Sequence, residues 1–264
     1  MLDIQLLSHF NDEQGEFIIL KLKPDEIDEF LDKLPIEYRK CYITDEQLVA
    51  SVRDLNMYYS DILKDHYLPD PGNVMSGEFG EILSYFLLKE RYLPENELDG
   101  PKKWRWKDDR NHAIQKTDII LFEYGTNPSS NDLLVSAEVK SKATKNNSYD
   151  PIKNAVAGAH DDFVSRLSTS LAWLKSRYVK ERNGEQVARV ERFLDPVTHG
   201  TYHKHFKAVV VIDDALLADE IARDRDLLAE FDAHFEILLV SIQGLKTAYE
   251  QTYENVLTSG SDIL

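Results

Sequence analysis

The chain of 264 residues has one cysteine and lacks the roughly eighteen consecutive apolar residues that a membrane-spanning helix requires. The lone Cys41 cannot form a disulfide within the chain, which is typical of proteins from reducing compartments, and we expect it to be a small buried residue. The first sixteen residues lack a basic stretch followed by an apolar core. We therefore expect no signal peptide, no membrane span and a cytoplasmic location.

Hydrophobic periodicity and turn residues divide the chain into predicted elements. We predict strands at 17–22, 103–107, 117–124, 133–141, 207–212 and 235–242. We predict one helix that begins at Pro24 and further helices at 45–64, 76–91, 151–180, 214–230 and 245–256. The turn-forming run at 68–73 separates an amino-terminal α+β region (1–70) from a second domain (71–264). The order of elements after this run predicts an α/β fold, with a mixed sheet flanked by helices.

Two apolar strands carry the most informative polar residues. Asp118 opens one strand, and Glu138 and Lys140 lie near the end of the next. Because strand side chains alternate, Glu138 and Lys140 project to one side while Val139 points into the core. Two carboxylates that converge at one sheet edge repel each other unless a cation lies between them. We therefore predict a Mg²⁺ site, open also to Mn²⁺, formed by Asp118, Glu138 and the Val139 carbonyl.

Such a metal lowers the pKa of a bound water and stabilises charge that develops on a phosphate, and Lys140 can assist either effect. The alternative is that Asp118 is a turn residue and that Glu138 and Lys140 form a solvated cross-strand pair. Both strands are otherwise strongly apolar, as buried strands are. Charged residues in them therefore favour a functional role.

The helix at 76–91 supplies a third acid near its start, where the helix dipole stabilises negative charge. Both Glu78 and Glu81 occupy this region. Glu81 adjoins the apolar residues Ile82 and Leu83, so we expect it to face the strands and reach the metal. Glu78 stays an alternative for this position.

These features together resemble the three motifs of PD-(D/E)xK nucleases. The matching segments are GEILSYFL at 80–87, Asp118 with its apolar tail, and Glu138-Val139-Lys140. This resemblance covers about 76–180 and implies a restriction-endonuclease-like core. The whole chain is similar to the HamA family, the nuclease subunits of Hachiman anti-phage defence systems. That similarity rests on GEFGEILSYFLL, KTDIILFE, AEVKSKAT, SRLSTSLAWLKSRY and the amino-terminal segment.

The resemblance implies a DNase that works with a superfamily 2 helicase, HamB, in a complex that restrains it until DNA is engaged. Transferred to this sequence, it makes Asp118 and Glu138 metal ligands. It makes Lys140 the catalytic lysine and Glu81 the acid of the first motif, with Glu78 as its rival.

The net charge of −16 opposes DNA binding, because neutralising phosphates provides most of the affinity of proteins for DNA. Positions 101–153 contain ten basic and seven acidic residues, so this window carries +3 and the rest of the chain −19. We therefore expect the chain alone to hold DNA weakly and a second subunit to deliver it. Candidate DNA contacts are Lys102, Lys103, Arg105, Lys142 and Arg166.

Two other functions are compatible with a nuclease fold. A catalytically silent module would bind and regulate a helicase partner, but such a module gains nothing from a crowded set of acids with a lysine. A stand-alone restriction or repair nuclease fits poorly with the acidic net charge and the absence of a recognisable DNA-reading domain. The sequence therefore favours a metal-dependent DNase subunit.

Overall fold

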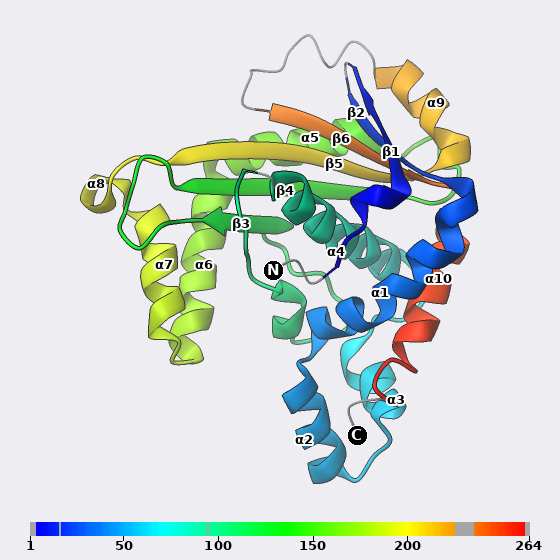
Figure 1. The fold of residues 1–264 in the computed structure, drawn as a ribbon, viewed down its shortest axis with the longest axis horizontal. Coiled ribbons are helices and arrows are strands. Elements are labelled where there is room, and N and C mark those ends of the chain that lie inside the picture. The colour runs from blue at the N-terminus through cyan, green and yellow to red at the C-terminus, as the bar shows by residue number, and fades with distance from the viewer. Residues whose placement is uncertain (1–3, 16, 94, 225–234, 262–264) are drawn as a thin grey trace.

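The computed structural model describes residues 4–15, 17–93, 95–224 and 235–261, which fold around a six-stranded sheet with helices on both faces (Figure 1). The strands are β1 (Phe10–Gln14), β2 (Ile18–Leu22), β3 (Ile119–Glu123), β4 (Leu133–Lys142), β5 (His203–Asp213) and β6 (Phe235–Ile242). Their order across the sheet is β1-β2-β6-β5-β4-β3. The β1/β2 and β3/β4 pairs are antiparallel and the three other pairs are parallel. This mixed sheet confirms the predicted α/β fold class.

Helices connect and cover the strands. They are α1 (Ile27–Tyr42), α2 (Asp45–Leu55), α3 (Tyr59–Ile62), α4 (Asn73–Tyr92), α5 (Pro151–Asp161), α6 (Leu167–Lys180), α7 (Gly184–Leu194), α8 (Pro196–His199), α9 (Asp214–Asp224) and α10 (Leu245–Val256). Short 3₁₀ turns are η1 (Leu7–His9), η2 (Pro24–Glu26) and η4 (Lys103–Trp106), and π-helical turns are η3 (Leu63–Tyr67) and η5 (Asp162–Arg166). Within the described ranges, no helix has the length and apolar character needed to cross a membrane.

The sheet lies between two helical layers, so its central strands are buried on both faces. Val135, Ala137 and Val139 of β4 belong to a core that also contains residues of α1, α4 and α10. The other face of the sheet packs against α5, α6, α7 and α9. This double burial accounts for the nearly continuous apolar sequences of β4, β5 and β6.

The predicted strand at 103–107 is wrong, because Lys103–Trp106 forms the 3₁₀ turn η4. Trp104 is buried and meets the Tyr85 ring of α4 edge-on. The Trp104 indole and the Lys103 ammonium also contact the Glu81 carboxylate. These tertiary contacts with α4 override the strand preference of the aromatic residues in this segment.

Several other predicted boundaries differ from the structure. The predicted helix at 45–64 is interrupted, because Asn56 adopts a left-handed conformation with φ 52° at the end of α2. The predicted helix at 151–180 contains the π turn η5 between α5 and α6. Strand β1 and helices α7 and α8 were not predicted from the sequence. The last part of the predicted helix at 214–230 lies outside the described residues.

The amino-terminal region contributes to the same sheet as the rest of the chain. Strand β2 pairs with β6 in parallel, and β1 forms the sheet edge. Helix α1 packs against α10, where the hydroxyls of Tyr42 and Tyr253 are 2.7 Å apart. The division into 1–70 and 71–264 stays a prediction, and the two segments share one core.

Candidate active site

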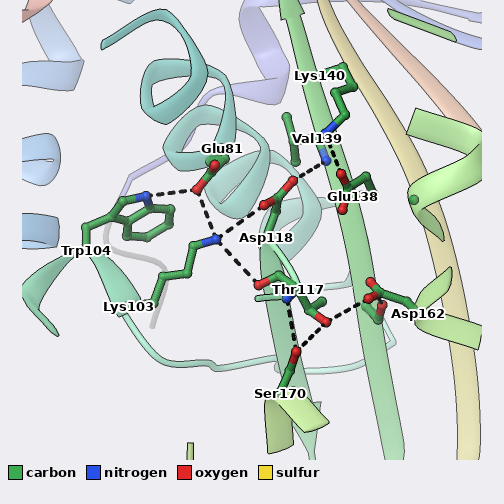
Figure 2. Close-up of polar contacts among 12 residues, drawn as sticks. Glu81, Lys103, Trp104, Thr117, Asp118, Glu138, Val139, Lys140, Asp162 and Ser170 are labelled. Atoms are coloured by element: carbon green, nitrogen blue, oxygen red, sulfur yellow. Dashed lines mark hydrogen bonds and ion pairs between the residues drawn. The ribbon is translucent and has the colours of Figure 1, made fainter. Parts of the chain in front are cut away.

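The pairing of β3 with β4 brings Asp118 next to Glu138. Ile119 pairs with Ala137 at the start of the antiparallel ladder, so Asp118 and Glu138 are the next residues in this register. The Asp118 Oδ2 atom accepts a hydrogen bond of 2.9 Å from the Val139 amide (Figure 2). Two acids that are distant in sequence thereby meet at the edge of β3.

Glu138 is buried, with 5% of its surface exposed, and both of its oxygens contact cationic side chains. Its Oε1 atom accepts a hydrogen bond from the Lys140 ammonium, and its Oε2 atom accepts one from the Arg166 guanidinium. Burial raises the pKa of Glu138, the Asp118 charge raises it further, and Lys140 and Arg166 oppose this rise. The carboxylate therefore lies among charges that fix its position.

Lys140 projects from the same face of β4 as Glu138, as the alternation of strand side chains predicts. It is half-buried at the wall of the cleft. Burial alone would lower the pKa of Lys140, but the Glu138 and Asp118 carboxylates raise it above its ordinary value. Lys140 therefore carries a positive charge at neutral pH beside the acids.

Glu81 reaches this cluster from α4. The helix packs closely on the sheet at Gly80, where an added Cβ atom would lie 3.4 Å from the Val211 side chain. The Glu81 Oε2 atom accepts a hydrogen bond of 3.1 Å from the Trp104 indole and lies 3.1 Å from the Lys103 ammonium. Burial raises the pKa of Glu81 to about 8, with Lys103 opposing and Asp118 adding to the rise.

Glu78, the alternative acid of α4, points elsewhere. It is 2% exposed, accepts a hydrogen bond of 2.7 Å from the Tyr42 hydroxyl, and pairs with Lys107. These contacts tie α4 to α1 and to the segment after η4. Glu81, in contrast, lines the same cleft as Asp118, Glu138 and Lys140. The geometry therefore favours Glu81 over Glu78 as the third acid of this cleft.

A second layer of hydrogen bonds supports the acids. The buried Asp162 of the π turn η5 accepts hydrogen bonds of 2.8 Å from the Thr117 and Ser136 hydroxyls. Its Oδ1 atom also accepts a hydrogen bond of 2.5 Å from Arg166 Nε. Ser170 of α6 accepts a hydrogen bond of 3.0 Å from the Thr117 amide. Through Asp162, the network thus connects Thr117, the residue before Asp118, to Arg166, which contacts Glu138.

The acids lie in an open cleft of about 930 Å³. Three carboxylates from separate elements line this cleft, and burial together with repulsion from Asp118 raises the pKa of Glu81 and of Glu138. Carboxylate oxygens are the ligands that hard divalent cations prefer. Glu81, Asp118 and Glu138 are the residues that could hold such an ion. The expected contribution of the Val139 carbonyl stays a prediction.

The candidate DNA contacts do not form one exposed surface. Lys103 and Lys142 are buried, and Lys142 pairs at 2.7 Å with Glu220. Arg166 lines the cleft, where it is bonded to Glu138 and Asp162. Lys102 and Arg105 line a separate cleft. Of these five residues, Arg166 is therefore the one that both contacts an acid of the cleft and has a partly exposed side chain.

Sequence reasoning missed the supporting residues Thr117, Asp162 and Ser170, and also Gly158, which packs against Glu138. The polar residues on the otherwise apolar face of 151–180 were the available signal for Asp162 and Ser170. Their partners are far away in the sequence, so the signal does not identify a role.

Comparison with protein families matches residues 3–256 to HamA. The chain belongs to the HamA family. The match includes α4, β3, β4 and η4, and therefore every residue of the acidic cleft described above. Membership in HamA implies a component of the Hachiman defence system. None of the curated proteins compared with this HamA chain matches it.

Proposed function

We propose that the chain is a divalent-metal-dependent DNA nuclease and the effector subunit of an anti-phage defence complex with a helicase. The observation that carries this proposal is the convergence of Glu81, Asp118 and Glu138 with Lys140 in one open cleft. Family membership supports the defence role. The PD-(D/E)xK resemblance supports hydrolysis of phosphodiester bonds.

Each residue of the cleft has a distinct part in this proposal. Asp118 and Glu138 supply carboxylate oxygens from neighbouring strands, and Glu81 supplies another from α4. Bound Mg²⁺ or Mn²⁺ would neutralise phosphate charge and make a water molecule more acidic. Lys140 holds Glu138 and presents its ammonium to the cleft, where it can stabilise negative charge on the phosphate.

The charge of the chain supports a role for a partner. A net charge of −16 repels DNA at long range, and Lys103, Lys140 and Arg166 are already paired with the acids at the cleft. A superfamily 2 helicase subunit of the HamB type would provide basic surface and deliver DNA to the cleft. This partner is part of the proposed function.

Plasmid cleavage by the chain with its helicase partner tests the proposal. We expect cleavage with Mg²⁺ or Mn²⁺ that stops on addition of a chelator. Glu138→Ala should reduce the rate by roughly 100-fold or more, because it removes a ligand of the metal that would stabilise charge in the transition state. Glu123→Ala, at the far end of β3, is the matched control and should cleave normally.

Undiminished cleavage by the Glu138→Ala protein would contradict the assignment of this site. If the complex assembles and engages DNA, but the unmodified chain cuts none with either metal, the chain is instead a silent module that regulates its partner.

A further inference from the structure

Lys103 holds two of the three acids of the cleft together. Its Nζ atom lies 3.1 Å from Glu81 Oε2 and 3.4 Å from Asp118 Oδ1 (Figure 2). The side chain is 6% exposed, so its ammonium is largely shielded from water. A buried amine in this position acts as a counter-ion, because it offsets the repulsion between the two carboxylates.

Different cationic side chains of the cleft contact different acids. Lys140 and Arg166 contact Glu138 on the α5 side of the sheet. Lys103 contacts Glu81 and Asp118 from η4. A divalent ion bound by the three acids would require carboxylate oxygens that the Lys103 ammonium contacts in this structure.

The surroundings of Lys103 give its ammonium a third acceptor besides the two carboxylates. The Thr117 carbonyl oxygen lies 3.4 Å from Nζ, on the side away from Glu81. Meanwhile, the buried Trp104 fixes η4 against α4 through its hydrogen bond to Glu81. The Lys103 side chain can therefore shift toward Thr117 while the backbone of η4 stays in place.

We propose that Lys103 competes with the divalent metal for Glu81 and Asp118 and stabilises the cleft while no metal is bound. This inference rests on the proposed metal-dependent function and concerns how the same site is controlled. A like charge a few ångströms from a divalent ion repels it strongly in a buried setting. Lys103 therefore weakens metal binding and makes the nuclease dependent on a higher metal concentration.

Titration of the 264-residue chain with Mn²⁺, followed by electron paramagnetic resonance, measures the competition directly. Lys103→Met and Lys103→Gln should each bind Mn²⁺ about tenfold more tightly than the unmodified chain, because both remove the repelling charge. Lys103→Arg keeps the charge and should bind Mn²⁺ with unchanged or weaker affinity. Lys89→Met is the matched control, because Lys89 is a buried lysine paired at 3.2 Å with Asp99 outside this cleft.

Thermal unfolding provides a second readout on the same proteins. Without metal, Lys103→Met and Lys103→Gln should unfold at a lower temperature than the unmodified chain, because the acids lose their counter-ion. Saturating Mn²⁺ should then raise the unfolding temperature of these variants by more than it raises that of the unmodified chain. Lys89→Met should lose stability without any change in the metal-induced increase.

Failure of the inference differs from failure of the proposed function. If the unmodified chain binds Mn²⁺, and the folded Lys103→Gln protein binds it equally or more weakly, Lys103 supports the metal site and the competition is refuted. If neither protein binds Mn²⁺, both the metal site and the competition are refuted.

Discussion

Gly158 of α5 lies directly against the Glu138 side chain. A Cβ atom at position 158 would be 2.5 Å from the Glu138 Cδ atom, closer than packed atoms approach. The Gly158 carbonyl also accepts a hydrogen bond of 2.8 Å from Arg166, which holds the same carboxylate. The absence of a side chain at 158 thus permits Glu138 to take its position.

Gly158→Ala should impair cleavage and metal binding while the protein remains folded. The added methyl group displaces the Glu138 side chain, whereas alanine itself favours the helix. Gly184→Ala is the control, because no atom lies within 4 Å of the added Cβ at that helical glycine. Normal cleavage by Gly158→Ala would show that the observed position of Glu138 is unnecessary.

Arg166→Lys should reduce cleavage by about tenfold or more, because lysine cannot reproduce the forked contacts of the guanidinium with Glu138 and Asp162. Since Arg166 acts through Glu138 in this interpretation, Mn²⁺ affinity should also fall. If only DNA affinity and its salt dependence change, Arg166 is instead a phosphate contact, as predicted from the sequence.

Glu78→Ala and Glu81→Ala should separate stability from activity. Glu78→Ala leaves the buried Lys107 without its acid and should lower the free energy of unfolding by about 3 kcal/mol. Glu81→Ala should abolish cleavage and weaken Mn²⁺ binding. Unfolding in denaturant and metal titration measure the two effects. The reverse result, with Glu78 required for activity and Glu81 dispensable, would move the first motif by three residues.

The stability of the metal-free protein should fall as pH rises from about 4.5 to about 8 because of Glu81. The folded pKa of Glu81 is about 8 and its ordinary value is 4.5, so the folded state binds more protons within this window. The slope from one such group is at most about 1.4 kcal/mol per pH unit. With chelator present, Glu81→Gln should show a shallower decline, and parallel curves for the two proteins would contradict this origin.

The isolated chain should bind duplex DNA weakly, and the helicase partner should increase both its affinity and the dependence of that affinity on salt. The reason is the net charge of −16 together with the burial of Lys103 and Lys142. Fluorescence anisotropy across a range of salt concentrations checks this expectation. Tight and steeply salt-dependent binding by the chain alone would place the DNA affinity in this subunit.

The strand pair of Asp118 and Glu138, and the residues of each strand that share a face, could be predicted from the sequence. An apolar strand that begins after Asp118, and another with Glu138 and Lys140 two positions apart, follow from a periodicity of two. Antiparallel pairing of these two strands, β3 and β4, then brings Asp118 close to Glu138. These contacts are predictable because strand geometry is local and the acids interrupt apolar sequence.

The contacts of the basic and aromatic residues around 103–107 depend on tertiary packing and could not be predicted from the sequence. The alternating basic and aromatic residues predict a strand, but Lys103 and Lys107 instead pair with Glu81 and Glu78 of α4. Likewise, Gly158 is an ordinary helical glycine in the sequence, and its contact with Glu138 depends on how α5 crosses β4. Packing between elements that are distant in sequence determines which cation contacts each acid. The free energy of burying a charge depends on its partners, and the local sequence does not specify them.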